Sequence, residues 1–288
     1  MSKQTDKLKN LLTENRILTA PAAFDALSAK IIEKNGFDIV WISGASLTNA
    51  FLGYADVGLI SYGEVKGVLQ NIVNAVNIPV MVDVDTGYGG IFNIQRMIKE
   101  FESIGIAGIQ IEDQTFPKRC AYFSGVNVIE VEEMEKKIKS ILMARENEDF
   151  KIVARSDAGK SMGFKEAVRR AKLYFEMGAD MLFLSAPKSE EEMNLMTETG
   201  LPFCTAVVEG TKTEEYSIKE LGDRGFKIVK YPQTLIRSTM KTMDEALSSI
   251  KESGYAKEID GFVATSDKRN EITDLQIFNQ IEKDLNSC

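Results

Sequence analysis

The feature that most constrains the fold of this chain is a regular alternation of short apolar runs with longer amphipathic segments. Segments with helical periodicity, such as 92–104, 131–144, 164–177 and 214–221, lie between the runs. Such an alternation predicts a parallel sheet covered by helices. There are eight runs rich in aliphatic and β-branched residues, at 17–21, 39–43, 80–85, 108–113, 151–157, 181–187, 202–209 and 226–231.

The number of runs favours a closed barrel over an open doubly wound sheet, the other architecture that the alternation allows. A chain of 288 residues, 44% of them hydrophobic, has the size of a (β/α)8 barrel, which typically takes ~250 residues. No G-x-G-x-x-G fingerprint of a dinucleotide-binding sheet follows the first run. We therefore expect an α/β fold, a (β/α)8 TIM-type barrel over residues 1–260, with a C-terminal helical extension over residues 261–288.

The extension keeps an apolar rhythm for which a closed barrel has no obvious place. Apolar surface left over in this way is typical of subunit interfaces. We expect the extension to pack on a neighbouring subunit, in a homodimer or homotetramer. The apolar residues concerned are Ile272, Leu275, Ile277, Phe278, Ile281 and Leu285.

Charge and composition exclude several partners and locations. A formal net charge of −8 disfavours binding to nucleic acid or to anionic membranes. The polar N-terminus lacks the apolar core of a signal peptide, and no apolar run reaches the ~18 residues of a membrane span. Three widely spaced cysteines, Cys120, Cys204 and Cys288, fit a reducing cytoplasm. We expect a cytoplasmic protein whose partner is a small-molecule carboxylate or phosphonate.

The chain contains no histidine. Ser-His-Asp and Cys-His catalysis, histidine-ligated zinc and HExxH chemistry are therefore excluded. Acid–base work must come from carboxylates, Cys, Lys or Tyr, and any metal must be held mostly by oxygen.

Polar residues gather where the apolar runs end, and in a barrel these ends form the rim that carries the active site. In the segment 80–90, VMVDVDTGYGG, Asp83 and Asp85 are two residues apart and on a strand would point to the same face. Two carboxylates so close need a cation or raised pKa values, and Mg²⁺ (or Mn²⁺) with oxygen ligands meets that need. The alternative is that both residues cap the following helix.

Three further positions provide two candidate ligands and a candidate anion binder. Asp56 and Glu112 could act on the ion through water, although each is also consistent with a solvated loop carboxylate. Arg155 and Asp157 end the fifth run, and an arginine inside an apolar run favours a bidentate grip on a substrate carboxylate or phosphonate. An ion pair between Arg155 and a rim carboxylate is the alternative.

The loop after the fourth run, Phe116-Pro-Lys-Arg-Cys-Ala-Tyr122, carries the candidate catalytic thiol. Lys118 and Arg119 are expected to lower the pKa of Cys120, giving a thiolate or a proton donor near neutral pH.

Together these motifs resemble the isocitrate lyase/phosphoenolpyruvate mutase superfamily over nearly the whole chain. The resemblance implies a barrel with Mg²⁺, an enolpyruvate-type intermediate, a mobile loop carrying K-R-C, and oligomers that exchange a C-terminal helix. It is carried by PAAFDALSAKIIEKNGFDIVWISG, D-x-D-x-G-[YF]-G at 83–89, GIQIEDQ at 108–114, PKRC at 117–120, IVARSDA at 152–158 and EGTKT at 209–213.

The resemblance also implies roles for single residues. Asp83 and Asp85 would be metal ligands, with Asp56 and Glu112 around them. A second group would hold or protonate the substrate: Ser43, Gly44 and Arg155 at its carboxylate, Lys118 and Cys120 on the mobile loop.

Three departures separate this chain from the lyases that it resembles. The loop continues K-R-C-A-Y instead of K-R-C-G-H, Ser185 stands where lyases have glutamate, and Ala206 where they have asparagine. The latter two positions normally hold a lyase substrate's second carboxylate. Trp41, Phe116-Pro117-Lys118 and Ser185 look more like the branch that makes or breaks P–C bonds, which places Trp41 and Ser185 at the substrate.

The sequence therefore predicts, first, a Mg²⁺-dependent phosphonomutase of the carboxyvinyl-carboxyphosphonate or phosphoenolpyruvate phosphorylmutase type. The alternative is a C–C lyase or decarboxylase of a 2-hydroxy or 2-oxo diacid, similar to methylisocitrate lyase, with Cys120 as the acid. A third hypothesis is a non-catalytic barrel that senses a small carboxylate.

Overall fold

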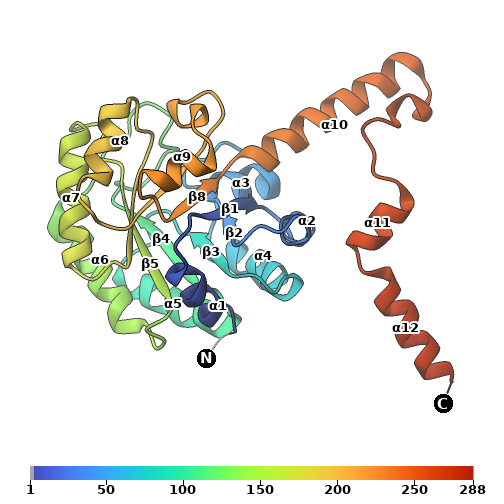
Figure 1. Cartoon of the computed structure of the whole chain (residues 1–288), viewed down its shortest axis with the longest axis horizontal. Coiled ribbons are helices and arrows are strands. Elements are labelled where there is room, and N and C mark those ends of the chain that lie inside the picture. The colour runs from blue at the N-terminus through green and yellow to red at the C-terminus, as the bar shows by residue number, and fades with distance from the viewer. Residues whose placement is uncertain (1–2, 288) are drawn as a thin grey trace. The chain divides into compact units, whose positions relative to one another are not determined.

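The structure is a computed structural model that describes residues 3–287. Its eight strands are parallel, each pairs with the next, and β8 pairs with β1 to close the barrel (Figure 1). The (β/α)8 fold expected from the sequence is thus confirmed. The strands are β1 Leu18–Ala23, β2 Val40–Ile42, β3 Val80–Asp83, β4 Gly108–Glu112, β5 Lys151–Ser156, β6 Met181–Leu184, β7 Phe203–Ala206 and β8 Ile228–Tyr231.

Helices follow the strands around the barrel, and α1 covers its N-terminal end, where Leu8, Leu11 and Leu12 pack against the core. The opposite end, formed by the C-terminal ends of the strands, is left for the loops. The helices and helical turns are α1 Lys3–Thr13, α2 Ala26–Lys34, α3 Gly44–Leu47, η1 Thr48–Leu52, α4 Tyr62–Ala75, α5 Ile91–Ile104, α6 Val131–Ala144, α7 Phe164–Glu176, α8 Glu190–Thr197, η2 Lys212–Glu215 and α9 Ile218–Asp223.

Local sequence explains where these elements begin and end. All four side chains of β3 are buried, as its apolar sequence requires. Helix α4 begins at Ser61, whose hydroxyl accepts from the amide of Glu64 while the Glu64 side chain accepts from the amide of Ser61. Helix α5 ends at Gly105, whose φ of 93° is accessible to glycine at little cost.

Two elements differ from the expectation. Strand β3 ends at Asp83, not Asp85, because the backbone turns and Asp85 takes a left-handed φ of 50°. The helix expected over 214–221 is broken into η2 and α9, because Ser217 forms a capping box with Glu220 and starts a new helix there.

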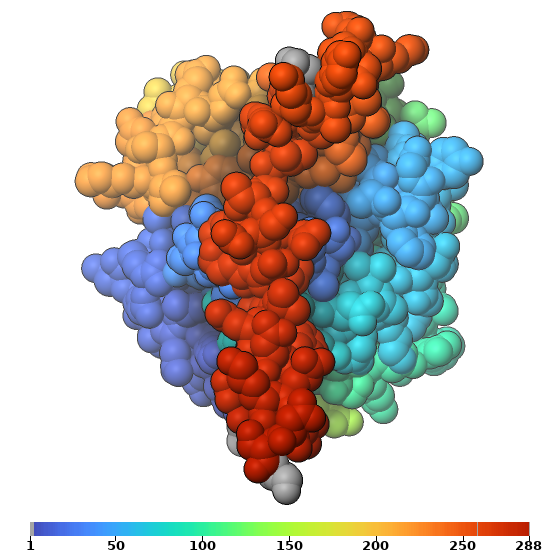
Figure 2. All heavy atoms as spheres, turned by 90° about the vertical axis from the view of Figure 1, so that its right-hand side faces the viewer, coloured from blue at the N-terminus to red at the C-terminus, as the bar shows by residue number. Residues whose placement is uncertain are grey.

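The chain forms two compact units, Met1–Thr234 and Leu235–Cys288, and the first contains the whole barrel. The boundary expected at residue 260 lies inside the second unit. The second unit holds all but the first residue of α10 Thr234–Ser253, together with η3 Ala256–Ile259, α11 Ser266–Ile272 and α12 Leu275–Asn286. Figure 2 shows its surface in orange to red, and no residue of α11 or α12 is buried. Among residues 3–287, no helix is both long enough and apolar enough to cross a membrane.

Candidate active site

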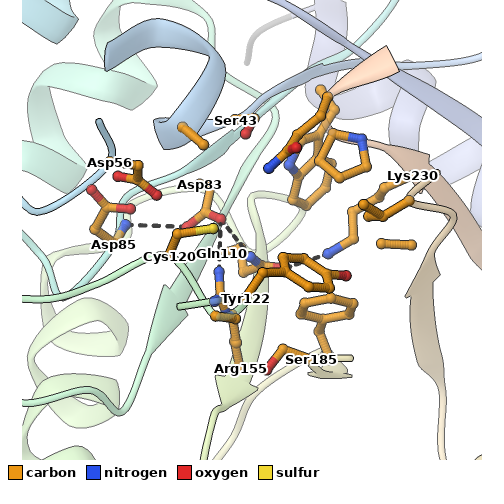
Figure 3. Close-up of a pocket in the computed structure, with 18 of the residues that line it drawn as sticks. Ser43, Asp56, Asp83, Asp85, Gln110, Cys120, Tyr122, Arg155, Ser185 and Lys230 are labelled. Carbon is orange, nitrogen blue, oxygen red and sulfur yellow. Dashed lines mark hydrogen bonds and ion pairs between the residues drawn. The ribbon is translucent and has the colours of Figure 1, made fainter. Parts of the chain in front are cut away.

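A cavity of about 60 Å³ lies at the C-terminal ends of the strands, where a barrel carries its active site. Strands β2 to β8 or the loops that follow them supply its walls. Gly44 and Glu112 do not line the cavity. The other residues singled out in the sequence do, and Figure 3 labels most of them: Trp41, Ser43, Asp56, Asp83, Asp85, Lys118, Cys120, Arg155 and Ser185.

Asp83 and Asp85 both reach the cavity, although they do not share the face of one strand. After the turn at the end of β3, the amide of Asp85 donates to Asp83 Oδ1 at 3.2 Å. Burial raises the pKa of both carboxyls. Gly44 permits the close approach, since a Cβ at this position would lie 2.6 Å from Asp85 Oδ1. Gly44 therefore leaves room for the Asp85 side chain but does not itself line the cavity.

Lys118 lies between two of the carboxylates. Its Nζ is 2.8 Å from Asp85 Oδ1 and also forms an ion pair with Asp56. Burial opposes the charge, but Asp85 and Asp56 outweigh it and raise the pKa of Lys118. The amide of Cys120 donates to the Asp56 carbonyl at 3.1 Å. The loop that carries Lys118 and Cys120 is therefore fastened over the cavity by its contacts with Asp56.

Arg155 joins three other carboxylates. Its Nη1 lies 3.2 Å from Asp83 Oδ2 and 3.0 Å from Glu112 Oε2, and its Nη2 lies 2.8 Å from Asp157 Oδ2. Arg155 therefore makes the structural ion pair that the sequence left as an alternative, and it also lines the cavity.

Asp157 is the most strongly bonded of these carboxylates. Burial works against its ionisation, but Arg155, Ser185 Oγ and Gln114 Nε2 donate to it and hold its pKa below the usual value. The hydroxyl hydrogen of Ser185 is thus committed to Asp157. Ser185 can offer a substrate only its oxygen lone pairs.

The pKa of Cys120 does not follow the expectation. Burial raises it, whereas the neighbouring Lys118 and Arg119 were expected to lower it. Lys118 does lower the pKa, but burial of the thiol outweighs it, and Asp56 also raises the pKa. Lys118 is itself paired with Asp56 and Asp85, and Arg119 Nη1 donates to the Ser124 carbonyl. Cys120 therefore keeps its proton at neutral pH.

Asp113, which adjoins Glu112, belongs to a separate network. It accepts from Ser156 Oγ at 2.7 Å and from the Tyr174 hydroxyl at 2.9 Å, and Arg170 lies 3.4 Å away. These contacts tie β4 to β5 and α7, so Asp113 supports the rim.

The residues of the cavity wall that the sequence analysis did not assign to the site include Gln110, Tyr122, Phe183 and Lys230. Lys230, only 2% exposed, donates from its Nζ to Gln110 Oε1 at 2.5 Å. The available signal was a lysine next to the last residue of the apolar run 226–231.

The residues around Asp85 fit a divalent cation by their donor chemistry. Among the described residues, no three acidic or cysteine side chains are gathered to hold a metal as they stand, since cations lie between them. However, in the part of the chain that the structure describes, only Lys118 and Arg155 form ion pairs with the five carboxylates. Buried negative charge needs compensation, and a hard ion with oxygen ligands supplies it. The five are Asp56, Asp83, Asp85, Glu112 and Asp157.

The fold and this site define an enzyme family. The chain belongs to the phosphoenolpyruvate phosphomutase family, whose model matches residues 8–251. It is similar to 2,3-dimethylmalate lyase of Eubacterium barkeri, with 36% identity over 277 residues that cover 96% of each chain. It is also similar to 2-methylisocitrate lyase of Aeropyrum pernix, with 37% identity over 96% of this chain and 88% of the relative.

The chain is also similar to a phosphorylmutase. The chloroplastic carboxyvinyl-carboxyphosphonate phosphorylmutase of Arabidopsis thaliana is 33% identical over 96% of this chain and 83% of the relative. The protein is therefore an enzyme of the isocitrate lyase/phosphoenolpyruvate mutase superfamily, as the sequence motifs predicted. The relatives do not single out the phosphonomutase reaction.

Solved structures agree on the fold. An oxaloacetate acetylhydrolase in complex with 3,3-difluorooxalacetate matches with a TM-score of 0.92 at 25% identity, over 99% of this chain and 98% of the other. A phosphonopyruvate hydrolase in complex with oxalate and Mg²⁺ matches with a TM-score of 0.87 at 28% identity, over 98% of this chain and 99% of the other.

Proposed function

We propose that the protein is a Mg²⁺-dependent lyase that cleaves a C–C bond of a 2-hydroxy diacid through an enolate. The observation that carries the proposal is the Cys120 thiol, which lines the cavity and has a pKa raised by burial. A lyase needs an acid that still holds its proton, because the carbanion that it releases must be protonated. A phosphoryl group moving between oxygen and carbon needs no such donor.

The carboxylates around Asp85, which would hold the metal ion, are suited to bind the 2-hydroxy acid part of the substrate. Asp85, with Asp83, Asp56 and Glu112 around it, would hold the ion, which supplies Lewis acidity toward a carboxylate and its neighbouring oxygen. The phosphonopyruvate hydrolase that this chain resembles was solved with oxalate and Mg²⁺, which have this chemistry. Arg155 orients Asp83 and Glu112 through its ion pairs.

The cleavage step can be written with these groups. The C2–C3 bond breaks, its electron pair passes to C3 and the carboxylate that C3 bears, and a 2-oxo acid is left. The hydroxyl proton passes to a carboxylate of the cavity, and C3 takes the proton of Cys120 Sγ. After the products leave, the carboxylate releases to solvent the proton that it took, and the thiolate regains a proton from solvent.

The loop over the cavity has to move in each turnover. A volume of about 60 Å³ is small beside the roughly 300–1,000 Å³ of typical ligand pockets, so we infer that the loop opens to admit the substrate. Lys118, through its ion pairs with Asp56 and Asp85, fastens the loop. The same contacts exclude water from the enolate once the loop has closed again.

The proposal is tested with a Cys120→Ser variant in the presence of Mg²⁺. We expect the wild type to release a 2-oxo acid from the diacid 2,3-dimethylmalate, and we include the tricarboxylates 2-methylisocitrate and isocitrate as further 2-hydroxy acids. We expect kcat of the variant to fall about 10²- to 10⁴-fold, the usual contribution of a general acid. Coupled reduction of the 2-oxo acid measures the rate. Cys204→Ala is the matched control, since Cys204 is buried and does not line the cavity.

The phosphonomutase expected from the sequence is the second candidate, and one observation favours it. Ser185 is committed to Asp157 and Ala206 has no polar side chain, so neither offers a hydrogen to a second carboxylate. Conversion of phosphonopyruvate by both the wild type and Cys120→Ser, without cleavage of the 2-hydroxy acids, would make this candidate the correct one.

We also propose that the second unit joins copies of the chain in a homodimer or homotetramer. Leu275, Phe278, Ile281 and Leu285 are exposed on the amphipathic helix α12, a face that a partner would cover. Sedimentation at micromolar concentration should therefore give a multiple of 32.0 kDa. A monodisperse monomer contradicts this, and Phe278→Glu should shift the assembly toward monomer.

A further inference from the structure

Lys230 is a buried cation that the proposed reaction has not used. It is the next-to-last residue of β8, is 2% exposed and lines the cavity. Its Nζ lies 4.6 Å from the ring centre of Trp41 and 3.2 Å from that of Phe183. Within the described chain it has no carboxylate within ion-pair distance, whereas Lys118 has two. A cation is costly to bury without an anion.

Among residues 3–287, the one polar partner of Lys230 is Gln110, which is held in place by Asp83. Gln110 Nε2 donates to Asp83 Oδ2 at 2.8 Å, and this bond turns Gln110 Oε1 toward Lys230. An ammonium group has three hydrogens to donate, and Gln110 accepts one of them. The aromatic faces of Trp41 and Phe183 stabilise the cation but accept no strong hydrogen bond. Lys230 is therefore left with capacity for an anion.

The position of Lys230 suits the second acid group of a substrate that carries one acid group at each end. Figure 3 shows Lys230 across the pocket from Asp56 and Asp85, with Asp83 and Gln110 between them. The wall next to Lys230 is apolar where Ala206 and Val208 line it. An anion whose first end lies near Asp85 can thus present a second acid group to Lys230.

We propose that Lys230 binds the distal acid group of the substrate, the carboxylate carried by C3 in the cleavage reaction. This inference rests on the proposed function and names its substrate class, a diacid. When the C2–C3 bond breaks, negative charge develops on that carboxylate, so a fixed cation beside it stabilises the transition state more than the ground state. Lys230 thereby takes the place of the polar partners that Ser185 and Ala206 do not supply.

Burial agrees with this role. It lowers the pKa of Lys230 to about 7 when no anion is bound. A carboxylate at Nζ favours the charged form, so binding and protonation of Lys230 support each other.

The test compares two ligands that share one end, each titrated calorimetrically with Mg²⁺ into the wild type and Lys230→Met. Oxalate carries only the end that faces Asp85, and 3,3-difluorooxaloacetate adds a distal carboxylate. Methionine keeps the length of the chain between Trp41 and Phe183. We expect the Kd for difluorooxaloacetate to rise about 30-fold or more in the variant, the usual effect of removing one partner of a buried charge pair, while the Kd for oxalate stays within about twofold. Lys151→Met, at the N-terminal end of β5, is the matched control.

Each other outcome has one meaning. The role of Lys230 is overturned if the variant loses affinity for both ligands equally or for neither. It is also overturned if the wild type binds difluorooxaloacetate no more tightly than oxalate. A third ligand, phosphonopyruvate, separates this result from the proposed function. If Lys230→Met weakens phosphonopyruvate and the diacids are not cleaved, Lys230 does bind the distal acid group, and it is the lyase proposal that fails.

Discussion

The two sides of the cavity handle buried charge in opposite ways. On the side of β3, β4 and β5, five carboxylates surround Lys118 and Arg155, and each cation contacts at least two of them. On the side of β6, β7 and β8, one cation, Lys230, lies among aromatic and aliphatic side chains. One side is short of positive charge and the other is short of negative charge.

The difference indicates how a substrate is oriented. A carboxylate-rich side binds a divalent cation and, through it, the oxygens of a 2-hydroxy acid. A side with one cation in apolar surroundings binds a single anion, because the low local dielectric strengthens that attraction. A diacid therefore has one favourable orientation, with its 2-hydroxy acid end on the carboxylate-rich side and its other carboxylate at Lys230.

The largest expected effect is on the carboxylate-rich side. Asp85→Ala should lower kcat by about a thousandfold or more, because the substrate oxygens lose the ion that stabilises their charge. Activity before and after EDTA, with Mg²⁺ restored, measures the effect, and Asp85→Asn is the variant that preserves shape. Full activity in excess EDTA would refute the metal assignment. The proposed difference between a metal-binding side and an anion-binding side of the cavity would then be wrong.

The next largest effect is on stability. Arg155→Met should lower the free energy of unfolding by about 3–5 kcal/mol, because Asp83, Glu112 and Asp157 lose their shared cation. Urea unfolding followed by circular dichroism measures the change. If Arg155→Met is as stable as the wild type, the carboxylates on this side do not depend on the arginine for compensation.

The smallest expected effect is of the opposite sign. Lys230→Met should raise the free energy of unfolding by about 1–2 kcal/mol and the melting temperature by a few degrees, since a buried cation without an anion is removed. The ordinary lysine pKa of 10.5 falls to about 7 on folding, so folding releases a proton between these values. The gain should be complete below pH 7 and should shrink as the pH rises toward 10.5.

Thermal unfolding of both proteins between pH 6 and pH 9 checks this dependence. The titratable and charged groups that act on Lys230, which are Cys204, Asp83, Arg155 and Asp157, are the same in both proteins. A gain that does not change with pH, or a loss of stability, would show that Lys230 is already compensated without a ligand.

The sequence by itself determined the barrel and the residues at its rim. Eight apolar runs became eight strands because burial on both faces leaves a continuous apolar signature that local sequence carries. The helices α5 and α6 lie within one residue of their expected bounds for a related reason: an amphipathic face repeats every 3.6 residues. Asp83, Asp85 and Arg155 were identifiable because charged residues at the ends of apolar runs are rare.

Only the tertiary structure decided what those rim residues do to one another. The pKa of Cys120 depends mainly on the burial of its thiol, which outweighs Lys118. Lys118 itself pairs with Asp56 and Asp85, which are distant in sequence. Asp85 left the strand face because the backbone turned one residue earlier. Lys230 was overlooked because its importance lies in the absence of a nearby carboxylate. Electrostatic energies depend on distance and on burial in three dimensions, and neither is encoded in residue spacing along the chain.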